Sequence, residues 1–315
     1  MKQEQEQEEY ARCRLCPRNC GVNRAAGEQG YCGETSALRL GAAVIHRGEE
    51  PPVTGAGGSG AVFVTGCNLR CPFCQNAQIS RERMGREVST ETFARICLEL
   101  QARGAENINI VTGSHAAPAL AAGIACARAQ GLAIPALWNS SAYERAETLS
   151  LLEGAVDGYL PDLKTLDSAV SRRLFNAPDY PERAPQAIER MIQASPLRFK
   201  NNLLVSGVII RHLALPGLLA ASRAVLRCFA DRWQGRALLS VMSQYTPAGN
   251  APLKRPLNGR EYERLVGWLR EFAIDEGFCQ DLAPDPGALP DFRRENPFPP
   301  ALSTPVWHFA APSSP

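Results

Sequence analysis

The sequence contains no long apolar run and almost no excess of charge of either sign. Its longest nearly apolar stretch, Ala116 to Ala127, is shorter than the ~20 residues that a membrane-spanning helix needs. Its first residues, MKQEQEQEEY, are polar where a signal peptide would be apolar. A net charge of +2 gives no reason to expect a nucleic-acid partner. We therefore expect a soluble, cytoplasmic protein with neither a membrane nor a nucleic-acid partner.

Cysteine, by contrast, is abundant. A chain of 315 residues can bury a core without disulfides, and an intracellular protein rarely forms them, so its eleven cysteines need another explanation. Four lie between Cys13 and Cys32, and three lie between Cys67 and Cys74. The others, Cys97, Cys126, Cys228 and Cys279, are scattered and behave as small apolar residues. The two groups indicate metal binding.

From residue 61 onward, apolar strand-like runs alternate with helix-like segments. The expected strands are residues 61–66, 106–112, 133–139, 157–163, 203–213 and 237–243. The expected helices are residues 91–104, capped by the hydroxyls of Ser89 and Thr90, and roughly 117–130, 142–154, 182–194, 217–233 and 259–276. Such alternation predicts an α/β fold with parallel strands, either a partial (β/α)6 barrel or an open doubly wound sheet.

The segments outside this alternation differ in composition. Residues 1–10 are expected to be a disordered acidic tail, and residues 11–50 a small four-cysteine, metal-bound knot. Residues 51–280 then form the barrel. Residues 281–315 hold nine of the 24 prolines together with several aromatic side chains, so we expect a Pro-rich tail that wraps across the barrel.

The segment GCNLRCPFCQN, Gly66 to Asn76, presents Cys67-x3-Cys71-x2-Cys74 directly after the first expected strand. Three thiolates can hold three iron atoms of a [4Fe–4S] cluster and leave the fourth iron open. A structural zinc site would need a fourth protein ligand. His46 and His115 are both distant in sequence, so the zinc interpretation requires a remote partner.

This cysteine spacing, with Phe73 before the last cysteine, resembles the motif of the radical S-adenosylmethionine superfamily. The wider stretch GSGAVFVTGCNLRCPFCQN is similar to the branch of pyruvate formate-lyase-activating enzymes. The resemblance implies a partial TIM-like barrel with a [4Fe–4S] cluster and S-adenosylmethionine as cofactors. It also implies reductive cleavage of S-adenosylmethionine to a 5′-deoxyadenosyl radical, which abstracts hydrogen from a substrate.

The resemblance also assigns cofactor-binding roles at the expected strand ends. An Asp-Leu-Lys element implies such roles for Asp162 and Lys164, whose alternative is an ion pair that closes the strand. The His of RHLALPG, His212, has a purely structural alternative. An Asn-containing turn implies a role for Asn139, with Ser141 as a further candidate or as a helix cap. The remaining assigned residues are Phe73 and Asn76.

One family element is absent. Many members carry a Gly-Gly-Glu run after the second strand, which holds the amino group of the cofactor. Here Thr112, Gly113, Ser114 and His115 occupy that place without an acidic residue. The amino-group contact therefore stays unassigned.

The N-terminal set Cys13-x2-Cys16-x3-Cys20-x11-Cys32 resembles the N-terminus of a poorly characterised branch of the activating-enzyme relatives. Four thiolates can close a zinc site or bind a second [4Fe–4S] cluster, and the residues do not choose between the two.

The sequence leaves three candidate functions. The branch resemblance implies an activase that installs a glycyl radical in a partner enzyme, supplied with electrons by a low-potential donor such as flavodoxin or ferredoxin. An alternative is radical modification of a peptide or a small molecule. A third, from another class, is a non-catalytic zinc protein that binds a macromolecule, against which the open three-cysteine motif argues.

Overall fold

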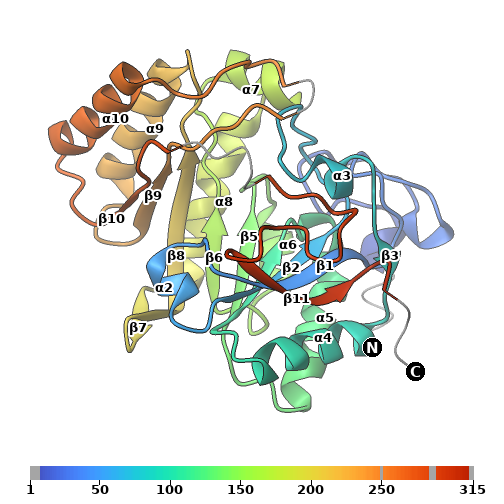
Figure 1. Ribbon diagram of the computed structural model, residues 1–315. Coiled ribbons are helices and arrows are strands. Elements are labelled where there is room, and N and C mark those ends of the chain that lie inside the picture. The colour runs from blue at the N-terminus through green and yellow to red at the C-terminus, as the bar shows by residue number, and fades with distance from the viewer. Residues whose placement is uncertain (1–7, 249–250, 284–288, 312–315) are drawn as a thin grey trace.

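The computed structural model describes residues 8–248, 251–283 and 289–311. A mostly parallel sheet forms its centre, in the order β10-β9-β8-β6-β5-β4-β2-β1-β11 (Figure 1). The strands along this order that run parallel to one another are β2 (Ser59–Val64), β4 (Ile108–Val111), β5 (Ala136–Ser140), β6 (Gly158–Pro161), β8 (Leu203–Leu213), β9 (Leu238–Met242) and β10 (Gly277–Cys279). The expected parallel α/β fold, a partial and open TIM-like barrel, is confirmed.

Helices cover one face of this sheet. They are α4 (Thr90–Ala102), α5 (Ala117–Ala129), α6 (Ala146–Leu151), α8 (Tyr180–Ala194) and α9 (Leu219–Arg232), with α7 (Ser168–Phe175) beside α8 and α10 (Gly259–Glu271) beside α9. The Ser89 hydroxyl accepts from the Thr92 amide at 3.2 Å and caps α4 as expected. In the part of the chain that the structure describes, no helix combines the length and apolarity needed to cross a membrane.

The side chains of each strand alternate between this helix-covered face and the opposite, concave face. Ile110 and Trp138 belong to the large apolar core that the helices cover. Leu137 and Leu160 instead pack with Val53 of α2 (Pro51–Thr54) on the concave face. The position of a residue within its strand therefore decides which face its side chain reaches.

The sheet begins before residue 51, where we expected the cysteine segment to end and the barrel to start. Strand β1 (Arg39–His46) pairs antiparallel with β2, and the short β3 (Arg86–Glu87) pairs with β1. Residues 39–46 were expected in the cysteine segment, but their side chains are mostly buried in the barrel core. Strand β7 (Arg198–Lys200) forms a hairpin with β8.

The N-terminal tail is also shorter than expected. Residues 1–7 lie outside the described part, but residues 8–11 are helical and Tyr10 is only 1% exposed. Tyr10 packs with Cys13 and Leu15, and the Arg24 guanidinium lies 4.8 Å from its ring centre. The contacts of this aromatic side chain order residues whose composition alone indicates disorder.

The Pro-rich C-terminal segment crosses the concave side of the sheet, except for residues 284–288 and 312–315, which lie outside the description. Phe292 is fully buried against Phe63 and Phe298. The segment is more regular than expected, because β11 (Ser303–His308) pairs with β1 at the edge of the sheet (Figure 1). An edge strand tolerates Pro305, since one side of it needs no hydrogen bonds.

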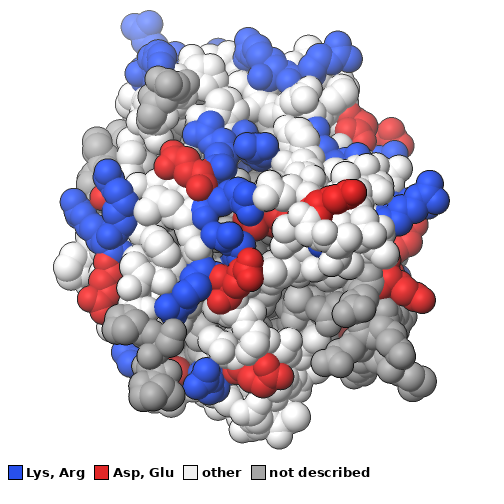
Figure 2. Space-filling model, turned by 90° about the vertical axis from the view of Figure 1, so that its right-hand side faces the viewer, with Lys and Arg blue, Asp and Glu red and all other residues white. Residues whose placement is uncertain are grey.

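Figure 2 shows the side of the molecule that carries the N-terminal cysteine segment. Lys and Arg side chains gather across the middle of this face, with Asp and Glu side chains among them. The surface here is mixed in sign, as the near balance of the whole sequence suggests.

Candidate functional site

The loop that carries Cys67, Cys71 and Cys74 follows β2 directly, at the edge of the sheet where the parallel strands end. It continues into α3 (Ala77–Ser80). The loop begins at Gly66, whose φ is +77°. A Cβ atom at this position would lie 2.5 Å from Cγ of Glu34. Both its conformation and its surroundings therefore require glycine.

Asn68 fastens this loop to the end of β5. Its side-chain amide donates to the Tyr143 carbonyl at 2.8 Å, and its side-chain oxygen accepts from Ser141 Oγ at 3.3 Å. Ser141 thus supports the loop and does not cap α6, which begins only at Ala146. Asn68 is buried and was not predicted as a site residue, although it lies inside the cysteine motif.

Two of the three sulfur atoms of the loop accept hydrogen bonds. Cys67 Sγ accepts from the amides of Leu69 and Arg70 at 3.3 and 3.5 Å, and Cys74 Sγ accepts from Ser80 Oγ at 3.5 Å. Burial raises the pKa of the Cys71 thiol, and the positive charge of Lys164 opposes that effect. The donors and the nearby cation favour the thiolates that a metal needs.

Asp162 and Lys164 follow β6, and their charged groups lie 2.6 Å apart. Burial disfavours the charged ammonium, but the charges of Asp162 and Cys71 outweigh it, so the pKa of Lys164 is raised. Lys164 therefore stays protonated beside the cysteine loop. The structure therefore places this predicted pair at the site. The two side chains also form the ion pair that the alternative interpretation predicts.

Tyr180 at the start of α8 holds the backbone of this pair in place. Its hydroxyl accepts from the Lys164 amide at 3.0 Å. It also lies within donating distance of the Asp162 and Ser141 carbonyl oxygens, at 2.6 and 2.9 Å. Tyr180 was missed because it lies in no motif, and only the packing of α8 brings it to the strand ends.

The other predicted residues near the loop have side chains that are partly free. Asn139 lies on the concave face of β5, and Asn76 precedes α3 without capping it. Neither side-chain amide makes a hydrogen bond to another residue in the described ranges. Phe73 packs edge-to-face against Tyr245, with ring centres 6.2 Å apart. The two amides are thus available to a ligand.

His212 does not face the site, contrary to the role that the resemblance implies. It lies on the helix-covered face of β8, next to Val208 and Ile210 in the strand's alternation. Its Nδ1 is 2.8 Å from the Leu163 carbonyl oxygen, and its Nε2 is 2.9 Å from Ser222 Oγ on α9. Burial lowers its pKa to about 4. His212 is a neutral structural residue that fixes the backbone between Asp162 and Lys164.

The loop after β4 contains no acidic residue of its own, but the carboxylate of Glu144, which follows β5, forms a hydrogen bond with it. Ser114 Oγ donates to Glu144 Oε1 at 2.7 Å, and Trp138 Nε1 donates to the same oxygen at 3.2 Å. Burial raises the pKa of Glu144. Because Trp138 belongs to the helix-covered core, this carboxylate supports the loop from behind. Thr112 in this loop has φ +66°, a strained value for a β-branched residue.

The four N-terminal cysteines gather beside the cysteine loop, and the Cys67 amide donates to the Cys32 carbonyl at 3.4 Å. All eleven cysteines are free thiols. No three His, Cys, Asp or Glu side chains of residues 8–248, 251–283 and 289–311 already stand as ligands of one metal ion. The chemistry of three thiols with donors to sulfur fits an iron–sulfur cluster, and binding requires the thiols to turn toward it.

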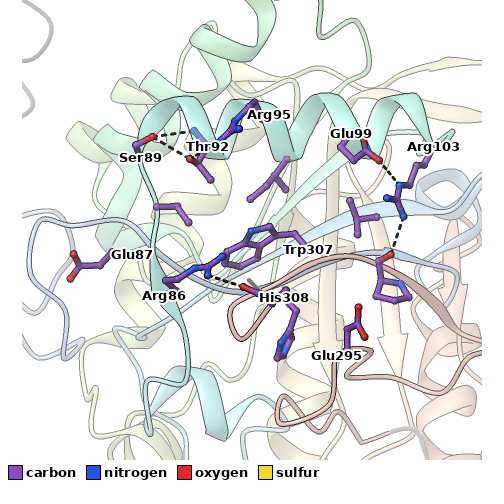
Figure 3. A pocket seen from close by; sticks show the side chains of 15 residues that line it. Arg86, Glu87, Ser89, Thr92, Arg95, Glu99, Arg103, Glu295, Trp307 and His308 are labelled. Carbon is purple, nitrogen blue, oxygen red and sulfur yellow. Dashed lines mark hydrogen bonds and ion pairs between the residues drawn. The ribbon is translucent and has the colours of Figure 1, made fainter. Parts of the chain in front are cut away.

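A cavity of about 680 Å³ lies apart from this site, between α4, β3 and β11 (Figure 3). Arg86, Arg95 and Trp307 are among its lining residues, and the Arg86 guanidinium lies 5.2 Å from the Trp307 ring centre. Three arginines and three glutamates line it, so its charges balance. None of the residues predicted for the site belongs to this lining.

Comparison with known proteins agrees with this arrangement of strands and cysteines. Residues 61–213, just under half of the chain, match the sequence model of the Radical SAM superfamily. An uncharacterized protein of Methanocaldococcus jannaschii is 28% identical over 279 residues, which cover 84% of this chain and 76% of that protein.

One solved structure is similar in fold. Streptococcus suis SuiB, bound to its precursor peptide SuiA, superposes with a TM-score of 0.50 at 15% identity over 68% of this chain. That match spans only 46% of SuiB. A domain of the pyruvate-formate lyase-activating enzyme of Bacteroides vulgatus matches half of this chain with a TM-score of 0.36, too weak to place the chain in that branch.

Residues 61–213 are therefore a radical SAM superfamily domain. The three-cysteine motif lies inside the matched range, as do Asn139, Asp162 and Lys164.

Proposed function

We propose that the protein cleaves S-adenosylmethionine reductively at a [4Fe–4S] cluster on Cys67, Cys71 and Cys74. The observation that carries this proposal is the meeting of the three free thiols with the Asp162–Lys164 pair at the carboxyl edge of a parallel sheet. Active sites of parallel barrels are built at this edge.

When bound, the cluster supplies the electron that splits S-adenosylmethionine into methionine and a 5′-deoxyadenosyl radical. The chain's own groups hold and orient its cofactors. Amides of Leu69 and Arg70 stabilise the Cys67 thiolate. Lys164 and Asp162 offer a cation and an anion to the charged methionine end, and Asn139 and Asn76 offer amides to the nucleoside.

The substrate that we propose first is a glycyl residue of a partner enzyme. The resemblance of GSGAVFVTGCNLRCPFCQN to the activating-enzyme branch supports it. A low-potential flavodoxin or ferredoxin would then be the electron donor. No contact in the described residues selects between a protein substrate and a small one, so the substrate rests on this resemblance.

The test begins with anaerobic reconstitution of the full chain with iron and sulfide. Dithionite and S-adenosylmethionine should then yield 5′-deoxyadenosine, and Cys71→Ala should abolish it while Cys228→Ala, outside both clusters of cysteines, should not. Candidate glycyl-radical enzymes should develop a glycyl radical doublet in electron paramagnetic resonance. Deuterium passing from a labelled peptide or small molecule into 5′-deoxyadenosine would instead identify radical modification. Absence of 5′-deoxyadenosine under all conditions would refute the proposal.

A further inference from the structure

The N-terminal segment buries only a few of its side chains and has little core to hold it together. Between residues 12 and 38, its only helix in the described structure is the 3₁₀ turn Arg24–Ala26. Its own apolar cluster is small, with Tyr10, Cys13 and Leu15 packed against Val22 and Leu151. Segments with so little core usually need a disulfide or a metal, and its four cysteines form no disulfide.

Backbone hydrogen bonds draw the segment together around its cysteines: the Cys13 amide donates to the Val22 carbonyl and the Gly21 amide donates to the Cys13 carbonyl, both at 2.9 Å. A Cβ atom placed on Gly30 would be 3.6 Å from both Cys20 Sγ and Cys32 Sγ. Three of the four are almost fully buried.

Two of the four sulfurs accept a hydrogen bond from a neighbouring group. The Tyr31 amide lies 3.3 Å from Cys20 Sγ, and the Arg24 guanidinium lies 3.6 Å from Cys13 Sγ. Donors to sulfur are the outer-shell contacts that stabilise metal-bound thiolates.

The burial of Arg24 independently indicates that this cysteine segment holds negative charge. It is 1% exposed, and its guanidinium donates to the carbonyls of Glu34, Thr35 and His115. It forms no ion pair with a carboxylate of the residues that the structure describes. The Glu34 carboxylate bonds to Thr65 and pairs with Arg39 and Arg83 instead.

A cation that is buried without an anion is strongly destabilised. With neutral thiols Arg24 would meet only uncharged groups, namely these three carbonyls and the Tyr10 ring. Four thiolates on a metal would place net negative charge beside it.

We propose that Cys13, Cys16, Cys20 and Cys32 bind a second metal centre through four thiolates, and that this centre fixes the radical SAM cysteine loop. The segment contacts that loop directly: Arg18 Nε donates to the Asn68 carbonyl at 2.8 Å, and the Cys67 amide donates to the Cys32 carbonyl at 3.4 Å. Zinc and a [4Fe–4S] cluster share this ligand chemistry, and the experiment separates them.

The experiment measures iron and zinc per chain on the full-length protein after anaerobic purification and reconstitution. A triple variant, Cys67→Ala with Cys71→Ala and Cys74→Ala, should keep either about four irons or about one zinc. Cys16→Ala with Cys20→Ala should lose that metal and keep about four irons. The matched control removes two cysteines outside both sets, Cys228→Ala with Cys279→Ala, and should keep both centres.

A triple variant without stoichiometric metal would overturn the proposal, as would a Cys16/Cys20 double variant with the metal content of the wild type. The triple variant retains every N-terminal cysteine, so the result does not depend on the folding of the double variant. The role of the centre in fixing the loop has a separate readout. Hydrogen exchange of residues 66–76 should be faster in the Cys16/Cys20 variant, and unchanged exchange would contradict that role.

This outcome is independent of the proposed activity. Metal in the triple variant with no 5′-deoxyadenosine from the wild type would refute the activity and leave the second centre standing. 5′-Deoxyadenosine from the wild type with no metal in the triple variant would leave the activity standing and refute the second centre.

Discussion

Asp162 and Lys164 form a charged pair beside the Cys71 thiol, and the two proposed roles of this pair have different consequences. As cofactor ligands, they act after the cluster has formed. We expect Lys164→Met to keep about four irons but to lower 5′-deoxyadenosine formation by about 10- to 100-fold. Arg103→Met, which breaks the exposed Arg103–Glu99 pair of α4, is the control and should leave activity unchanged. A Lys164 variant with full activity would show that the pair only closes the strand.

The lowered pKa of His212 predicts how the free energy of unfolding responds to acid. Its folded pKa of about 4 lies below the value of ~6.5 in an unfolded chain, so below pH 6.5 the unfolded state binds the extra proton. Its contribution to stability is complete above pH 6.5 and falls by about 1.4 kcal/mol per pH unit as the pH drops toward 4. His212→Gln should therefore flatten the pH dependence.

Urea unfolding at pH 7, 6 and 5 under anaerobic conditions measures this effect. His115, whose pKa burial lowers to about 3, acts in the same direction and remains in the variant, so the flattening should be partial. Equal slopes for the wild type and His212→Gln would contradict the buried, neutral His212.

The sequence motif predicts which candidate ligands lie near the cysteine loop better than it predicts the residues that support them. The cysteines, Asp162 and Lys164 could be named because spacing places them at a strand end. Asn68 and Tyr180 could not, since their roles depend on contacts with residues 75 and 18 positions away in the chain. The orientation of His212 could not be predicted either, because the alternation of β8 turns its side chain toward α9 and a motif match does not record that direction.

At the scale of elements, the alternation of apolar runs predicted every parallel strand from β2 to β9. The bounds shift where a residue forbids the expected conformation. Pro135 has no amide hydrogen to donate, and β5 begins at the next residue. Ala142 takes a φ of +57°, so α6 begins four residues later than expected. β1 and β11 were not predicted, because their pairing joins opposite ends of the chain.

The connection between β1 and α2 holds an ion cluster that sequence patterns do not reveal. Arg211 on the concave face of β8 donates to Glu50 Oε1 at 2.9 Å and also pairs with Glu49. All three side chains are largely buried. Burial opposes the charge of Glu50, but Arg211 outweighs it and lowers the pKa of that carboxyl.

Removing Arg211 would leave two buried carboxylates without their cation. We expect Arg211→Met to destabilise the fold by about 3–5 kcal/mol in urea unfolding. Arg223→Met, which breaks a half-exposed pair with Glu271, should cost about 0–1 kcal/mol. Similar losses in the two variants would mean that solvent screens the Arg211 cluster despite its burial.

At the scale of the whole molecule, both ends of the chain converge on the radical SAM cysteine loop. The N-terminal segment reaches it through Arg18 and Cys32. The C-terminal segment reaches α3, which directly follows the loop: Gln78 Nε2 donates to Asp291 Oδ1 at 2.9 Å, and the Phe292 amide donates to Gln78 Oε1 at 2.7 Å. The barrel strands alone therefore do not complete the environment of the site.

Phe292 is the anchor through which the C-terminal segment is tied to this environment. Its buried ring lies 5.4 Å from Phe63 of β2, and its carbonyl oxygen lies 3.0 Å from His308 Nε2 of β11. Truncation to alanine leaves a cavity between the segment and the sheet, and we expect a loss of about 3–5 kcal/mol. Phe199→Ala, at an exposed aromatic position, is the control and should cost little.

The Phe292→Ala variant also tests whether the C-terminal segment stabilises only the fold or supports the site as well. If the Gln78 contacts transmit the docking of the segment to α3, Phe292→Ala should release iron faster to a chelator at a urea concentration where the protein stays folded. Ser80, whose hydroxyl donates to Cys74, lies in that helix, so loosening α3 would directly affect a cysteine that we propose as a cluster ligand. Destabilisation with an unchanged rate of iron release would confine Phe292 to the core and leave the cysteine loop independent of the C-terminus.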